Sequence, residues 1–125
     1  MSKILQLCTL PADTVVPVSG MLERVGGDRE LLAEVIGFFL EDCPELMAVM
    51  RQGLFDGDCL AVRRAAHSLI GSAGNFDGLA VTAVARTLEA HALAEDLPAS
   101  HLAFSHLETE TCRLLTHLTA ILATL

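Results

Sequence analysis

Residues 98–124 carry apolar side chains at an unbroken helical spacing, and this feature constrains the fold more than any other. The spacing is three or four residues at every step, and it runs through Phe104, Leu107, Thr111, Leu114, Leu118, Ile121 and Leu125. Side chains that recur in this way lie on one face of an α-helix. Pro98 fits the start, because proline is favoured in the first turn of a helix. The segment therefore predicts one long amphipathic helix.

The composition also favours helices over strands. The chain of 125 residues is 52% hydrophobic, yet it has only five Phe and no Trp or Tyr. Strand-rich domains usually contain more aromatic and β-branched residues than this. The length suits one domain, and the apolar fraction is ample for its core.

Three earlier segments, residues 28–54, 58–75 and 79–95, show the same periodicity. Asp28 is a suitable N-cap for the first of them. Pro44 lies inside that segment and removes a backbone donor, so we expect either a kink or a break with the helix restarting at Pro44. Turns rich in Asp, Asn and Gly separate the segments.

The apolar face of each segment predicts its share of the core. In the first segment this face holds Leu32, Val35, Phe39, Leu46, Val49 and Met50. In the second it holds Val62, Ala65, Ala66, Leu69, Ala73 and Phe76. In the third it holds Val81, Val84 and Leu88.

Four amphipathic helices joined by short turns predict an all-α fold, an antiparallel up-and-down four-helix bundle, for a domain at residues 21–125. Residues 1–20 contain Pro11 and Pro17 and are predicted to be an irregular lead-in. We expect at most a turn or two of helix around residues 19–25.

The charge of the chain argues against a nucleic-acid partner. Eight basic and 16 acidic residues give a net charge of −8, whereas binding a phosphate backbone requires Lys and Arg in excess. One stretch, residues 56–75, escapes the acidic excess, because Asp56 and Asp58 are balanced there by Arg63 and Arg64.

Location and redox state follow from the N-terminal stretch and the cysteines. The apolar run at residues 4–10 is too short to cross a bilayer and has one basic residue ahead of it, which makes a weak secretory signal. The four cysteines have no C-x-x-C spacing, so neither a zinc site nor a redox dithiol is indicated. We expect free thiols, a cytoplasmic protein and no membrane partner.

A helical wheel of the second segment places His67 on the solvent side, opposite to the predicted core. Arg63, Gly71 and Gly74 lie within about 40° of it. Two glycines on one helix face are unfavourable for the helix, and a physical reason for them is access to the imidazole. An exposed imidazole with space and a cation beside it suits a phosphoryl carrier, because its neutral nitrogen is nucleophilic near pH 7.

Residues 65–76 read AAHSLIGSAGNF and resemble the signature of histidine-containing phosphotransfer (HPt) domains, in which Ala-His-x-Leu-Lys-Gly precedes a short turn. The resemblance extends over residues 20–95. It implies a four-helix bundle whose His67 accepts a phosphoryl group from the aspartyl phosphate of one response-regulator receiver and passes it to another. It also implies a receiver domain or a hybrid sensor histidine kinase as partner.

The resemblance further implies a phosphocarrier that is not itself an enzyme and has no cofactor, because the receiver supplies the aspartate and Mg²⁺. The sequence agrees, since Lys3 is its single lysine and it has no P-loop motif. We expect a monomer.

Two positions depart from the family pattern. The usual lysine three residues after the histidine is Ile70, and the usual glycine of the next turn is Asp77. We expect Arg63 and Arg64 to stabilise the phosphate in place of the lysine. Ile70 is expected to be exposed apolar surface that, with Ser68, contacts the partner.

Two other function classes stay open at this stage. One is an HPt-like binding module that docks a receiver or kinase and regulates it without carrying phosphate. The other is a helical bundle with only a structural or oligomeric role. A metal site is not indicated, because His106 with Glu110 is the one suitable pair of ligands. Glu89 is interpreted as ordinary helix surface.

Overall fold

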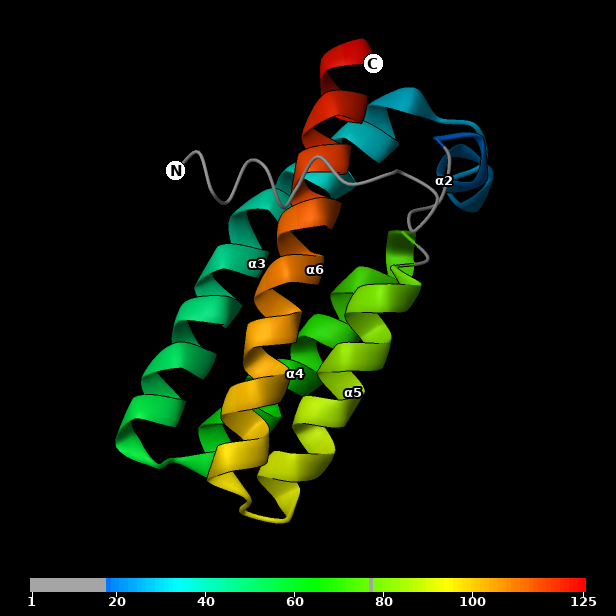
Figure 1. Ribbon diagram of the computed structural model, residues 1–125. Helices are drawn as coiled ribbons and strands as arrows, with labels where there is room; N and C mark the ends of the chain where they lie inside the picture. The colour runs from blue at the N-terminus through cyan, green and yellow to red at the C-terminus, as the bar shows by residue number, and fades with distance from the viewer. Residues whose placement is uncertain (1–17, 77) are drawn as a thin grey trace.

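The computed structural model describes residues 18–76 and 78–125, and these residues form helices joined by short turns (Figure 1). The elements are α2 (Val18–Arg24), α3 (Arg29–Asp56), α4 (Cys59–Ala73), the 3₁₀ turn η2 (Gly74–Phe76), α5 (Leu79–Leu93) and α6 (Leu97–Thr124). The prediction of an all-helical bundle is confirmed. The short helix α2 agrees with the helical turns expected around residues 19–25, whereas the rest of the predicted lead-in, residues 1–17, lies outside the described residues.

Aspartates begin the three helices α3, α4 and α6. Asp28, Asp58 and Asp96 each accept a hydrogen bond from the backbone N–H three residues later, at 3.1 Å in every case. Such caps are each worth about 0.5–2 kcal/mol of stability. At the other end of α3, Gly57 adopts a left-handed conformation, with φ of 72°, which glycine adopts without strain. Local sequence therefore sets these helix boundaries.

Helix α3 continues through Pro44, so the expected alternative of a break with a restart there is wrong. The residues on either side of the proline, Phe39, Cys43 and Met47, are all buried in the same core. Packing along one continuous face offsets the roughly 3 kcal/mol that a proline costs in a helix interior.

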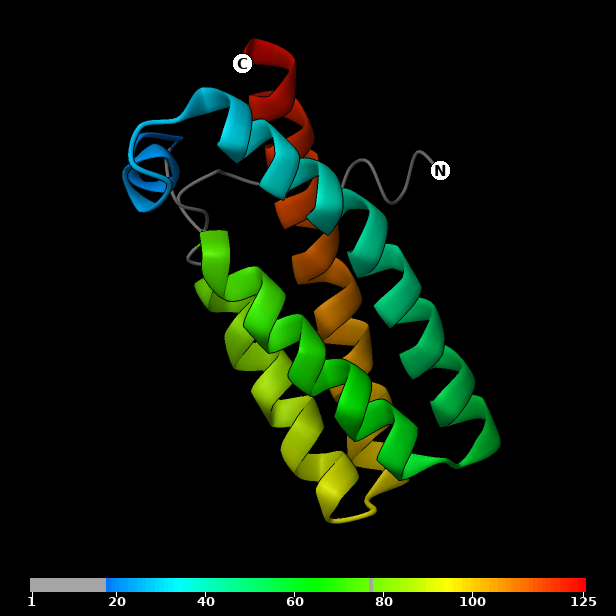
Figure 2. The same cartoon turned by 180° about the vertical axis from the view of Figure 1, so that it is seen from behind.

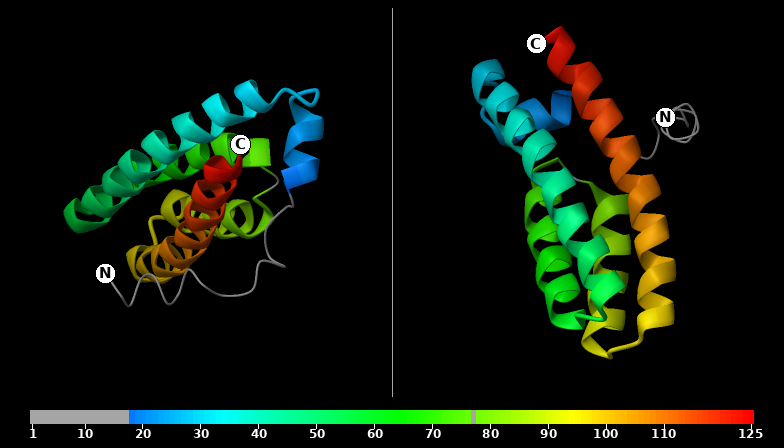
Figure 3. Two further views of the ribbon diagram at one scale, coloured as in Figure 1. Left: turned by 90° about the horizontal axis from the view of Figure 1, so that it is seen from above. Right: turned by 90° about the vertical axis from the view of Figure 1, so that its left-hand side faces the viewer.

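The bundle consists of two long and two short helices. Helices α3 and α6 have 28 residues each, whereas α4 and α5 have 15 each. Consecutive helices reverse direction, and the two turns after α3 and α5 lie at the same end (Figures 1 and 2). The long pair extends beyond the short pair at the other end, where α2 packs (Figure 3).

The core lies between the four helices α3, α4, α5 and α6 and contains most of the predicted residues. Every core residue predicted for the second segment is buried. On α3 the prediction is partly wrong, because Val49 is 48% exposed, whereas Ile36, Cys43 and Met47 are buried. Phe39 of α3 and Phe76 of η2 form an edge-to-face pair with ring centroids 5.2 Å apart. On α6, Thr111 is buried and its hydroxyl donates to the carbonyl of Leu107.

The cysteines do not all match the expectation of free thiols. Cys43 is buried and Cys59 is half-buried, and both are free. Cys112 is disulfide-bonded, so the expectation is wrong for this residue. Cys8 lies outside the described residues. Among the helices in the described part of the chain, none is both long and apolar enough for a membrane crossing.

Candidate functional site

The imidazole of His67 projects from the exposed face of α4, and 76% of its side chain is accessible to solvent. The opposite face of α4 packs into the core through Val62, Ala65 and Leu69. Because core packing fixes the rotation of α4 about its axis, the exposed position of His67 follows from the apolar pattern of the helix.

The carboxylate of Glu89 on α5 holds the imidazole. The Nδ1 atom of His67 lies 2.7 Å from Oε2 of Glu89, and the Glu89 side chain is 29% exposed. The interpretation of Glu89 as ordinary helix surface is therefore wrong. An ionised carboxylate only accepts hydrogen bonds, so Nδ1 carries the proton and donates it. This contact leaves Nε2 with a free lone pair.

The turn between α4 and α5 brings the two residues together. Gly78 is buried there, and a Cβ at this position would lie 3.3 Å from both the Ala73 carbonyl and a Leu114 methyl group. The backbone N–H of Gly78 donates to the Ala73 carbonyl at 3.1 Å. This close approach sets the register of α5 against α4. Asp77 is not among the described residues.

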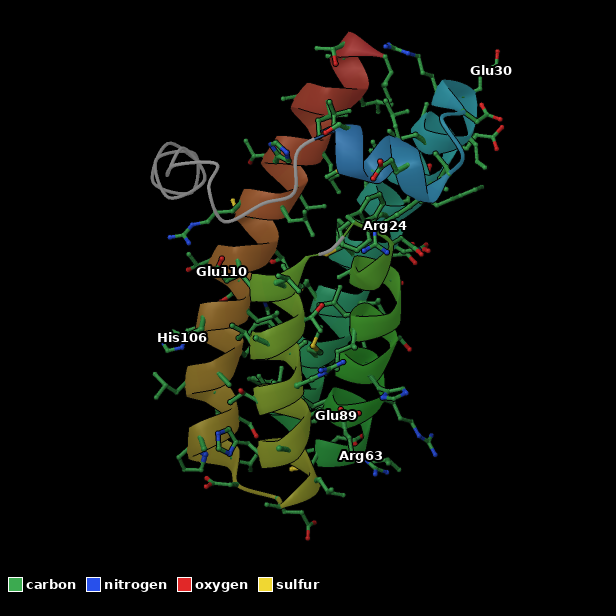
Figure 4. All side chains as sticks on the ribbon, turned by 90° about the vertical axis from the view of Figure 1, so that its right-hand side faces the viewer. Arg24, Glu30, Arg63, Glu89, His106 and Glu110 are labelled. Atoms are coloured by element: carbon green, nitrogen blue, oxygen red, sulfur yellow. The ribbon has the colours of Figure 1, made fainter. Side chains whose placement is uncertain are left out.

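Two arginines border the histidine on α4. Arg63, Arg64, His67, Ser68 and Glu89 line one shallow depression on the surface. Figure 4 shows Arg63 and Glu89 close together on the neighbouring helices α4 and α5. The depression thus gathers two guanidinium groups and one carboxylate beside an exposed imidazole. A phosphoryl group would find cationic hydrogen-bond donors there.

The two glycines near His67 leave space. A Cβ at Gly71 or at Gly74 would meet no heavy atom within 4 Å. Neither glycine has a positive φ, so the backbone does not require glycine at these positions. Their effect is to leave the surface above the histidine low and open.

Ile70 differs from the expectation. It is half-buried and packs against the core instead of forming an exposed apolar rim. The physical reason is its position on α4, about 60° around the helix from His67 and beside the buried Ala66 and Ala73. Of the residues expected at the site, Arg63, Arg64, His67 and Ser68 gather in the depression, whereas Ile70 contributes to the packing beneath it.

A second and larger groove lies between α3 and α6, and its lining contains none of the residues expected at the site. Arg51 spans it, pairing with Glu108 at 3.1 Å and stacking on the Phe104 ring at 5.6 Å. His106 and Glu110 project from α6 away from the His67 site (Figure 4). Glu110 is paired with Arg113 at 2.8 Å. Within the described ranges no three His, Cys, Asp or Glu side chains are grouped as metal ligands.

Comparison with known proteins assigns the chain to a family. The family model described as "Hpt domain" matches residues 34–124, which include His67 and Glu89. Searches of curated proteins and of solved structures found no match. The chain therefore belongs to the Hpt domain family, whose members are phosphocarriers of phosphorelay signalling that interact with receiver domains and histidine kinases.

Proposed function

We propose that this Hpt domain, folded as an antiparallel up-and-down four-helix bundle over residues 21–125, carries a phosphoryl group on Nε2 of His67. It accepts the group from the aspartyl phosphate of one receiver domain and donates it to the aspartate of another. The observation that supports this most directly is the 2.7 Å contact between His67 Nδ1 and Glu89, which leaves Nε2 free on an exposed ring.

The transfer step conserves charge and atoms without a further reactant. The Nε2 lone pair of His67 attacks the phosphorus of the aspartyl phosphate, and the bond between phosphorus and the carboxylate oxygen breaks. The aspartate leaves as a carboxylate, and the imidazole becomes a phosphorylated ring that still carries its Nδ1 proton. Positive charge develops on this ring, and the Glu89 carboxylate stabilises it, as a buried acid does for the histidine of a catalytic triad.

The surroundings of His67 can stabilise a bound phosphoryl group and leave room for a partner to reach the ring. Arg63 and Arg64 border the same depression and offer charged donors to the phosphoryl oxygens. The open surface over Gly71 and Gly74 gives the active site of a receiver a path to Nε2. Ser68 also lines the depression, so a docked receiver would contact it.

The carrier depends on its receiver for the other reactants of the transfer. It has no nucleotide site of its own, in keeping with a single lysine and no P-loop. The receiver supplies Mg²⁺ and the aspartate. The domain acts as a monomer in the cytoplasm.

The test is phosphorylation by a receiver. The chain and its His67→Gln variant are incubated with a phosphorylated receiver domain and Mg²⁺, and their intact masses are measured at neutral pH and after acid treatment. We expect an acid-labile phosphoryl group on the unmodified chain and none on the variant. The variant should melt at the same temperature, because an exposed side chain contributes little to stability.

A failure to label separates the two remaining functions. If a folded chain binds the receiver but is never phosphorylated, the protein is a docking module and the carrier proposal is wrong. A label that persists in His67→Gln would place the phosphoryl group elsewhere and would also overturn the proposal.

A further inference from the structure

We propose that Arg86 of α5 contacts the phosphoryl group on His67 and prolongs the lifetime of the phosphohistidine. This inference rests on the proposed function of His67. It adds a residue from the neighbouring helix to a phosphate site that sequence spacing places on α4 alone.

The contact between His67 and Glu89 shows which turns of α4 and α5 lie level with each other. The position of Arg86 follows from this register. Helices α4 and α5 pack side by side and run in opposite directions (Figure 2). One turn toward the start of α5 therefore lies level with one turn toward the end of α4. Arg86 is one turn before Glu89 on the same side of α5, so it lies level with Ile70 and Gly71. This is one helical turn from His67, about 5.4 Å along the axis.

The charges on the two sides of His67 along the α4 axis are uneven. A phosphoryl group brings nearly two negative charges, and Glu89 adds a third. Arg63 and Arg64 balance these from the side of the α4 N-terminus. On the other side Ile70 is apolar and Gly71 has no side chain. Arg86 is the basic residue at this level of the two helices.

Arg86 is also available for such a contact. It is exposed, and in the described part of the chain it forms no hydrogen bond or ion pair. By contrast, Arg51 and Arg113 are engaged with Glu108 and Glu110. The surface over Gly71 is open, so nothing blocks the guanidinium group from the phosphoryl oxygens.

A cation at this place should slow hydrolysis. Phosphoryl transfer passes through a loose transition state in which the leaving metaphosphate carries less charge than the bound phosphoryl group. A guanidinium group on the phosphoryl oxygens therefore stabilises the phosphohistidine more than it stabilises this transition state. Without Arg86 the phosphohistidine should lose its phosphate faster.

The experiment measures the half-life of phosphohistidine after the receiver has been removed. It compares the unmodified chain with Arg86→Ala, Arg86→Lys and the control Arg29→Ala, which removes an exposed arginine at the start of α3. We expect Arg86→Ala to shorten the half-life by about 1.5-fold to fivefold, the range for an exposed charged contact. Arg86→Lys should keep most of the lifetime, and Arg29→Ala should leave it unchanged.

A double variant tests the position of the charge. Ile70→Lys in the Arg86→Ala background returns a cation at the same level from α4, and we expect it to restore the half-life. An unchanged half-life in Arg86→Ala, an equal loss in Arg29→Ala, or no recovery with either lysine would overturn this inference. Those outcomes leave the proposed function intact, because that function fails only if the unmodified chain takes no label on His67.

Discussion

The hydrogen bond between His67 and Glu89 should control how fast the histidine accepts phosphate. Removing the carboxylate in Glu89→Ala frees the ring to rotate and leaves the developing positive charge unpaired, so we expect at least a tenfold slower transfer, or about 1.4 kcal/mol. Glu89→Gln keeps an oxygen that accepts from Nδ1 but loses the charge, so its rate should lie between the two. Rapid-quench measurement with a phosphorylated receiver gives these rates.

The matched control is Glu34→Gln, which neutralises an exposed glutamate on α3. It should accept phosphate at the unmodified rate. Equal rates in all four proteins would show that Glu89 neither orients nor charges the ring. Unchanged melting temperatures would confirm that the differences arise at the site.

Sequence reasoning identified His67 but not its partner, and the reason is physical. The exposure of His67 and the glycines beside it follow from the periodicity of a single helix. The pairing with Glu89 joins residues 22 positions apart on two helices. It depends on the register of α5 against α4, which the tight packing of Gly78 determines. No spacing rule within one helix reports that register.

Within helix α3, replacing either of two glycines by alanine should change the stability of the fold, in opposite directions for the two positions. A Cβ at Gly37 would meet no heavy atom within 4 Å, so Gly37→Ala gains helix propensity and should stabilise the fold by about 0.5–1 kcal/mol. A Cβ at Gly53 would lie 2.8 Å from a Val62 methyl group and 3.1 Å from the Asp58 carbonyl oxygen. Gly53→Ala should therefore cost about 1–3 kcal/mol.

Urea unfolding followed by circular dichroism measures both effects on one helix. If Gly53→Ala also stabilised the protein, α3 and α4 would not approach each other as closely as described.

The predicted boundaries of α3 are correct to within two residues, because Asp28 and Gly57 act locally. Val49 was wrongly predicted to be in the core for a different reason. Over the 28 residues of α3, the helices packed against it determine which side chains are buried.

The middle of α3 should also respond to alkaline pH through Cys43. Burial raises the pKa of its thiol from 9.0 to about 12, because the interior disfavours the thiolate. The unfolded chain thus loses this proton more easily. The stability that the neutral thiol contributes is fully present below pH 9 and is lost as the pH rises through about 12.

Alkylation tests the burial of Cys43 at a lower pH. At pH 8.5 in the absence of urea, iodoacetamide should modify the half-buried Cys59 while Cys43 stays unmodified. Cys43 should react only when urea unfolds the bundle. Modification of Cys43 in the folded protein, at a rate similar to that of Cys59, would contradict the buried position of this part of α3.

At the scale of the whole molecule, charge is distributed so that the site differs from its surroundings. The chain carries −8, yet residues 56–75 are neutral and hold Arg63 and Arg64 beside His67. The active site of a phosphorylated receiver is itself anionic. A neutral face with two arginines should therefore guide such a partner to the site while the acidic remainder repels it elsewhere. The charge pattern was evident from sequence, whereas its position beside Glu89 required the packing of two helices.

Reversing these charges tests the guidance directly. Each exchange of a basic residue for Glu changes the charge by two, so Arg63→Glu with Arg64→Glu gives a net charge of −12, from −8. We expect this pair to slow association with the phosphorylated receiver by about tenfold at low salt, with recovery toward the unmodified rate near 0.5 M salt. The control, Arg29→Glu with Arg51→Glu, has the same net charge but changes two exposed arginines of α3 that do not line the His67 depression. If both double variants slowed association equally in stopped-flow measurements, net charge alone would govern the encounter, and the two arginines beside His67 would have no local effect.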